Sequence, residues 1–246
     1  MNPISKAIRR LMRSRGFDFV RYRPKGIGED PFDDLRHFVG TRKAPVIFDV
    51  GANVGLVAER FRGAFPGSWI HAFEPSPATY EKLKARCGGI PKVLTWNCGV
   101  GARDGTLKLL ENDHPDMTSF LSPTDLAWGK VVKTTDVEVV TLDSFTHQHD
   151  IGSIDILKSD TQGFEFEVFK GAERLLRENK IGLIYFELLV SEQYKGVPPY
   201  YEIFRYLSER NYSLVTFYES HYQKELISWT DALFVNREYM LRRADR

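Results

Sequence analysis

Four carboxylates stand where apolar runs of the sequence give way to turn residues. A short apolar run bounded by turn residues is typical of a buried β-strand. Ligands of open α/β sheets bind at the carboxyl ends of the strands. We therefore expect the four side chains to border one crevice, where carboxylates bind cations, accept hydrogen bonds or accept a proton. They are Asp49, Glu74, Asp160 and Glu187.

The turn Asp49-Val50-Gly51-Ala52-Asn53-Val54-Gly55 ends a predicted strand and opens a helix. Glycines without a Cβ allow a ligand to approach the backbone closely. A dinucleotide site would have glycine in place of Asn53, and Asp49 would lie close to the pyrophosphate. A cationic amino acid group is a better partner, and an ordinary glycine turn is the alternative. The expected cofactor contacts are Asp49, Gly51, Ala52, Asn53 and Gly55.

Glu74, which precedes Pro75, is expected to hold a ribose. An acidic side chain at the end of the second strand can accept hydrogen bonds from both ribose hydroxyls. NAD and S-adenosylmethionine both contain such a ribose, so Glu74 indicates an adenosine-containing ligand without choosing between them. A solvated carboxylate is the alternative. The third predicted strand ends at Cys98, where we expect the protein to contact the edge of the adenine ring.

Alternating strands and helices must position these side chains. The pattern predicts a mostly parallel sheet covered by helices, with an inserted β segment at Thr106–Leu110 and Val137–Thr141. The predicted strands are Val46–Val50, Trp69–Glu74, Val93–Cys98, Ile154–Asp160, Leu183–Glu187, Ser213–Tyr218 and Ala232–Asn236. The predicted helices are Val54–Phe65, Pro77–Arg86, Phe164–Glu178 and Pro199–Arg210.

Four motifs resemble those of the FkbM-type methyltransferases, over roughly Val46 to Asn236. They are the Asp49–Gly55 turn, Phe73-Glu74-Pro75, Val140-Thr141-Leu142-Asp143-Ser144-Phe145, and Leu157–Glu165 followed by Lys170-Gly171-Ala172. The resemblance implies a class I methyltransferase fold, Rossmann-like, with a seven-stranded sheet and helices on both faces. It also implies S-adenosylmethionine as donor and O-methylation of sugars or natural products.

Asp160 is the first candidate for a catalytic group. In methyl transfer to a hydroxyl, the protein must align the acceptor and remove its proton. Asp160 can accept that proton or orient the ammonium group of the donor, and a helix N-cap is the structural alternative. The following Thr161-Gln162-Gly163 replaces the Pro-Pro-aromatic turn often found in nitrogen methyltransferases, which favours oxygen. Further candidates for the base are Glu187, His114 and His221.

Other features carry weaker signals. Glu165, with Asp160 and Glu187, could hold a divalent cation through oxygen ligands, although a carboxylate in a first helical turn also suits the helix dipole. The irregular segment Glu111–Lys130 could close over the acceptor. Aromatic residues are dense between Tyr194 and Tyr222, where stacking on sugar rings competes with packing in the core or an interface.

Composition restricts the partners. The 246 residues carry a net charge of +1, so the protein as a whole has no positive electrostatic field that would attract nucleic acid. Two cysteines form neither a C-x-x-C pair nor a zinc set, so we expect a reducing, cytoplasmic location. No apolar run is long enough to span a membrane.

Residues 1–45 are expected to form a basic N-terminal extension and linker, and residues 46–246 the catalytic domain. Pro24, Gly26, Gly28 and Pro31 are expected to break regular structure there. Within residues 4–15, Ile4, Ile8, Leu11 and Met12 have helical spacing and basic residues surround them. This pattern is typical of a helix that lies on an anionic membrane at the inner face. Packing against the domain or a second subunit is the alternative.

The function predicted from these features is O-methylation of a hydroxyl on a sugar, glycan, glycolipid or related natural product. Two alternatives remain open at this point. One is a nicotinamide-dependent oxidoreductase, against which the missing glycine pattern argues. The other is a binding module that keeps the fold and transfers nothing.

Overall fold

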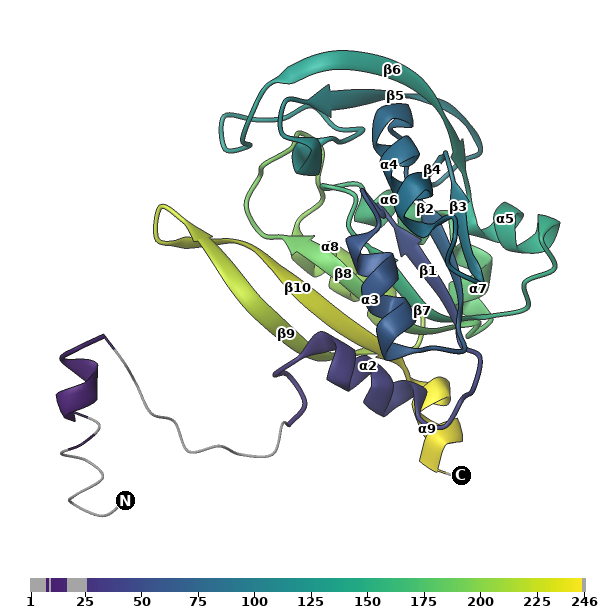
Figure 1. Cartoon of the computed structure of the whole chain (residues 1–246), viewed down its shortest axis with the longest axis horizontal. Helices are drawn as coiled ribbons and strands as arrows, with labels where there is room; N and C mark the ends of the chain where they lie inside the picture. The colour runs from purple at the N-terminus through teal and green to yellow at the C-terminus, as the bar shows by residue number, and fades with distance from the viewer. Residues whose placement is uncertain (1–7, 9, 17–25, 245–246) are drawn as a thin grey trace.

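A seven-stranded sheet forms the centre of the protein (Figure 1). The computed structural model describes residues 8, 10–16 and 26–244. All strand pairs of this sheet are parallel except the two made by β10. In spatial order the strands are β3 (Val93–Trp96), β2 (Trp69–Phe73), β1 (Val46–Val50), β7 (Ile154–Ser159), β8 (Ile181–Leu189), β10 (Leu226–Asn236) and β9 (Tyr212–Gln223). The expectation of a mostly parallel seven-stranded sheet is confirmed.

Helices cover both faces of this sheet (Figure 1). One face packs on α2 (Pro31–Val39), α3 (Leu56–Ala64) and α4 (Pro77–Cys87). The other packs on α5 (Leu142–Gln148), α6 (Glu165–Lys170), α7 (Glu173–Arg177) and α8 (Tyr200–Ser208). Alternate residues of a strand point to opposite faces, so in β1 Ile47 joins the first core and Phe48 the second. α9 (Arg237–Ala244) follows β10.

The predicted β insertion is present as a three-stranded sheet in the order β4 (Gly99–Val100), β6 (Val131–Val140) and β5 (Gly105–Asn112). A short 3₁₀ helix, η1 (Pro115–Met117), lies between β5 and β6 in the chain. β6 begins six residues before the predicted Val137. Those residues, Val131–Asp136, are largely exposed, so no apolar alternation marked them as a strand.

The expectation that Pro31 breaks regular structure is wrong, because α2 begins at this residue. A proline fits the first helical position, where its missing N–H would have no intrahelical partner. Asp30 caps the helix by accepting hydrogen bonds from the N–H groups of Phe32 and Asp33. Leu35 is fully buried in the core. The division of the chain at residue 45 stays a prediction, although α2 contributes to this core.

Several predicted boundaries also change. The predicted helix Phe164–Glu178 is divided into α6 and α7 at Gly171, where a Cβ would lie 2.0 Å from the carbonyl oxygen of Gly101. α5 was not predicted; Thr141 caps it by accepting the N–H of Ser144. The final two strands are longer than predicted and form a hairpin that projects from the sheet (Figure 1).

The described part of the N-terminal segment includes helical residues 10–13. Ile8 and Leu11 are exposed, whereas Ile4, Lys6 and Arg9 lie outside the described residues. Over the described ranges, no helix combines the length and apolar character needed to cross a membrane. Contact of this segment with a membrane surface stays a prediction.

Candidate active site

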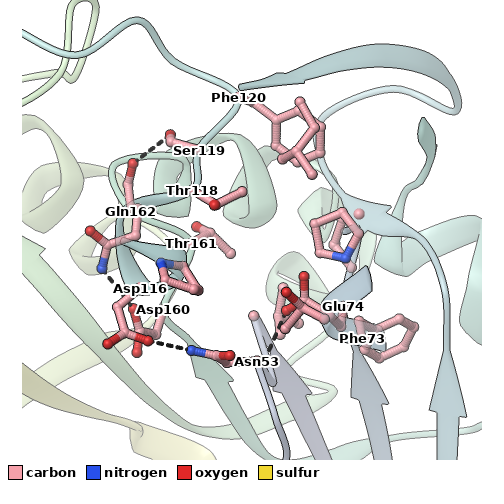
Figure 2. Close-up of a pocket in the computed structure, with 18 of the residues that line it drawn as sticks. Asn53, Phe73, Glu74, Asp116, Thr118, Ser119, Phe120, Asp160, Thr161 and Gln162 are labelled. Atoms are coloured by element: carbon pink, nitrogen blue, oxygen red, sulfur yellow. Dashed lines mark hydrogen bonds between the residues drawn. The ribbon is translucent and has the colours of Figure 1, made fainter. Parts of the chain in front are cut away.

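A cavity of about 230 Å³ opens at the carboxyl ends of β1, β2 and β7 (Figure 2). The insertion supplies another part of its wall through β4, η1 and Phe120. Seven residues predicted from the sequence line it: Gly51, Asn53, Glu74, Pro75, Cys98, Asp160 and Glu187. The structure therefore brings together most of the predicted cofactor and catalytic groups.

The two glycines of the first turn are required by packing of the protein itself. Gly51 has φ +74°, and a Cβ there would lie 1.8 Å from the carbonyl oxygen of Asp160. A Cβ on Gly55 would lie 2.8 Å from Cδ1 of Leu83 in α4. Gly55 and the buried Ala52 do not line the cavity. Their expected cofactor contacts are thus not supported by the geometry, whereas Gly51 lies in the wall.

Glu74 is buried in the cavity wall and held by the backbone. Its two carboxylate oxygens accept the N–H groups of Asn53 and Ser76, each at 2.9 Å. Burial raises the pKa of Glu74 to about 7, although these two donors lower it. The carboxylate is therefore fixed in one orientation toward the cavity. The side-chain Nδ2 of Asn53 donates to Asp116 of η1, and its buried Oδ1 has no protein partner.

Asp49 does not line the cavity, so this geometry gives no support to the expected direct contact with a cationic ligand, which stays a prediction. Its side chain is fully buried, and Oδ1 lies 3.1 Å from Nζ of Lys158. Burial raises the pKa of Asp49, and Lys158 opposes this shift. Burial also opposes the charge of Lys158, but Asp49 and Asp160 raise the pKa of the amine above its ordinary value.

Lys158 is a site residue that sequence reasoning missed. It donates to the carbonyl oxygen of Gly51 at 2.9 Å and lies 3.6 Å from Oδ2 of Asp160. The available signal was a lysine inside the apolar run Ile154–Ser159, because a buried lysine requires a partner. Side chains two positions apart along a strand point to the same face, and Lys158 accordingly lies beside Asp160.

Gln162 is the second missed residue, and it connects the two candidate bases. Its Nε2 donates to Oδ1 of Asp160 at 3.2 Å and to Oε2 of Glu187 at 2.8 Å. Its Oε1 accepts the hydroxyl of Tyr194 at 3.0 Å. Burial raises the pKa of Glu187 well above its usual range, and the neighbouring carboxylates of Asp160 and Glu165 raise it further. Figure 2 shows Gln162 and Asp160 side by side in the cavity wall.

Glu165 is buried at the start of α6 and bound to its own turn. Its Oε1 accepts hydrogen bonds from both the N–H and the hydroxyl of Thr161. Burial raises its pKa to about 7. Within the described residues, no group of three His, Cys, Asp or Glu side chains is suited to hold a metal ion. The predicted cation set of Asp160, Glu165 and Glu187 is therefore not assembled.

A second cavity, of about 480 Å³, adjoins the first and shares Asp116, Gln162 and Glu187 with it. His114 lines this second cavity together with Trp128 and Trp229. His221 lines neither cavity; its ring stacks on Trp229 with a centroid distance of 4.6 Å. The structure therefore leaves His114 as the candidate histidine base near an acceptor and places His221 behind an indole.

The charge of the first cavity restricts its ligand. Four carboxyl groups line it, and none of its described lining residues is Lys, Arg or His. They are Glu74, Asp116, Asp160 and Glu187. Such a wall offers no cation to the pyrophosphate of a dinucleotide and suits a ligand with positive charge. S-adenosylmethionine fits, since its sulfonium and ammonium groups are cationic and Glu74 can accept from its ribose.

Known proteins similar to this chain are methyltransferases, in agreement with a site that suits S-adenosylmethionine. Residues 49–214 match the model of the methyltransferase FkbM domain. The chain is 26% identical over 170 residues to the 2-O-methyltransferase NoeI of Sinorhizobium fredii, covering 63% of this chain and 68% of that protein. It is 29% identical over 165 residues to the 31-O-demethyl-FK506 methyltransferase FkbM of Streptomyces tacrolimicus, covering 56% and 64%. The chain thus spans about two thirds of the length of these relatives.

Among solved structures, the magnesium protoporphyrin IX methyltransferase of Synechocystis PCC 6803 aligns with a TM-score of 0.48 and 10% identity, over 96% of this chain and 98% of that chain. The family match and the strand order confirm the predicted class I methyltransferase fold. This chain belongs to the FkbM methyltransferase domain family, a family of S-adenosylmethionine-dependent methyltransferases.

Proposed function

We propose that this protein is an O-methyltransferase that methylates a hydroxyl group of a sugar, a glycolipid or a related natural product. The observation that carries the proposal is the first cavity, whose wall contains four carboxyl groups and no basic side chain among the described residues. The names of the two relatives specify transfer to oxygen. The same wall disfavours the nicotinamide alternative, because a dinucleotide would place its pyrophosphate among carboxylates.

The residues of the cavity divide into two groups by their position. Glu74 and Asn53, at the ends of β2 and β1, would hold the ribose side of the donor. Gln162 and Glu187 line both cavities, Asp160 lines the first cavity and accepts a hydrogen bond from Gln162, and these three side chains would face the reacting groups. When bound, S-adenosylmethionine supplies a methyl group that is already activated by a positively charged sulfur.

The chain itself must orient the acceptor hydroxyl and take up its proton. A carboxylate is too weak a base to ionise an alcohol beforehand, but it can accept the proton as the new bond forms. Burial and neighbouring carboxylates raise the pKa of Glu187, which makes it a stronger base than an ordinary glutamate once it is ionised. The amide of Gln162 fixes both carboxylates, so we propose that the pair Asp160 and Glu187 serves as the proton acceptor.

Two shape-preserving variants test this assignment. Asp160→Asn and Glu187→Gln should each lower turnover, and the variant that removes the base should lower it by about 10²–10⁴-fold. The affinity for S-adenosylhomocysteine, measured by calorimetry, should change much less. Loss of affinity in proportion to turnover would assign Asp160 to the ammonium group of the donor. Near-normal turnover in both variants would reject the pair and direct the search to His114.

A further inference from the structure

The second cavity has an aromatic wall made by two indoles. Trp128 comes from the segment before β6 and Trp229 from β10, and their rings meet edge to face at a centroid distance of 5.4 Å and an angle of 82°. Trp128 is 53% exposed. His221 stacks on Trp229 at an interplanar angle of 11°, which supports that indole from behind. Exposed indoles beside a cavity are typical of ligand contact, because they present apolar area with few rotatable bonds.

Hydrogen bonds tie the segments that carry these indoles to one another. Gln223 of β9 donates from Nε2 to the carbonyl oxygen of Leu126. Gln193 donates from Nε2 to the hydroxyl of Ser228, and its carbonyl oxygen accepts the N–H of Thr124 at 2.8 Å. The wall is therefore formed before any acceptor arrives, which lowers the entropic cost of binding.

Polar groups line the same cavity as the indoles. They are His114, Asp116, Gln162, Glu187 and Gln193, and the remaining lining is Met117 and Leu189. A sugar ring likewise combines apolar and polar groups. The C–H groups of one face are apolar, while the hydroxyls around the edge donate and accept hydrogen bonds. A flat aromatic ligand would leave the polar groups without partners, which is costly in a buried site.

We propose that the second cavity is the acceptor subsite and that it takes a sugar ring stacked on the exposed indole of Trp128 and bordered by Trp229. One hydroxyl of that ring points to the junction of the two cavities, where Gln162 and Glu187 belong to both. This inference rests on the proposed O-methyltransferase function and names a sugar ring as the part of the acceptor that this cavity binds.

The test uses the full chain saturated with S-adenosylhomocysteine and a panel of methyl glycosides of glucose, galactose and mannose, with cyclohexanol as a non-sugar alcohol. Saturation-transfer NMR reports which ligand protons contact the protein. At least one glycoside should show transfer to its ring C–H protons, and cyclohexanol should show much less. Trp128→Ala should weaken this binding by about fivefold or more, and Trp128→Phe should restore part of it.

Trp69→Ala is the matched control, because Trp69 is also an exposed indole but lies at the opposite end of β2. It should leave glycoside binding unchanged. Binding of S-adenosylhomocysteine should be unchanged in all three variants. If the wild type binds S-adenosylhomocysteine but no glycoside, or if Trp128→Ala binds glycosides normally, the sugar subsite is refuted while the methyltransferase proposal stands. If the wild type does not bind S-adenosylhomocysteine, the proposed function itself fails, and this inference with it.

Discussion

The amine of Lys158 lies 3.1 Å from the carboxylate of Asp49, and the two side chains are 5% and 0% exposed. The same amine donates to the carbonyl oxygen of Gly51, in the wall of the first cavity, and faces Asp160. A buried ion pair thus lies directly beneath the cavity. Asp49 does not line the cavity itself and is linked to its wall through Lys158.

Lys158→Met should lower the free energy of unfolding by about 3–5 kcal/mol, because it leaves Asp49 as an uncompensated buried charge. Urea denaturation followed by circular dichroism measures this change. The double variant Lys158→Met/Asp49→Leu should recover much of the loss, since it removes both charges.

Lys170→Met is the matched control for this experiment. Lys170 pairs with Glu167 on the surface, and such pairs contribute about 0–1 kcal/mol. If Lys158→Met were no less stable than this control, the buried pair would not have the role described.

Glu74 should make donor binding depend on pH. Its pKa is raised to about 7, so the group is charged above that pH and becomes neutral as the pH falls through it. The two carboxylate oxygens of Glu74 already accept hydrogen bonds from the N–H groups of Asn53 and Ser76. Protonation of the carboxylate therefore leaves fewer lone pairs to accept hydrogen bonds from the ribose hydroxyls. Between about pH 8 and about pH 6, the Kd for S-adenosylhomocysteine should rise by up to about tenfold in total.

Two variants isolate this effect in calorimetric titrations. Glu74→Ala should weaken binding by about 1.5–3 kcal/mol and flatten the pH profile. Glu59→Gln changes a carboxylate that pairs with Arg86 outside the cavity, and it should keep the wild-type profile. A flat profile in the wild type would show that Glu74 does not contact the donor as an anion.

The strands that position the site were predictable from the sequence. Each of them is a short apolar run, buried on both faces, that ends in turn residues. Asp160 and Glu187 were correctly expected to share a crevice with Glu74, since carboxyl ends of parallel strands meet at one edge. β6 was predicted only in part, because its first residues pair with β5 while facing solvent. The alternation of apolar and polar residues along the sequence gives no signal for such a strand.

The roles of individual side chains were harder to predict than their location. Asp49 stands in a motif that suggests a ligand, but its partner Lys158 is more than a hundred residues away in the chain. Gln162 adopts a left-handed backbone with φ 55°, and this turn directs its amide between two carboxylates from different strands. Both contacts depend on tertiary structure, which periodicity does not reveal.

Deletion of residues 1–15 should abolish binding to vesicles with anionic lipid and spare the affinity for S-adenosylhomocysteine. The segment is basic, and its described apolar side chains Ile8 and Leu11 are exposed, as a helix at a membrane surface requires. Flotation of the protein with vesicles, with and without anionic lipid, measures this. A shortened chain that misfolds or changes its oligomeric state would instead support packing of this segment against protein.

The central claim is transfer of a methyl group from S-adenosylmethionine to a hydroxyl oxygen of a sugar-containing acceptor. The most direct measurement incubates the protein with S-adenosylmethionine carrying a deuterated methyl group and with glycan and glycolipid fractions of host cells, followed by mass spectrometry before and after mild alkali. We predict label in an alkali-stable methyl ether on a sugar, strongly reduced in the double variant Asp160→Asn/Glu187→Gln. Label found only in alkali-labile esters or on nitrogen, or no transfer to any fraction by a protein that binds the donor, would contradict the account.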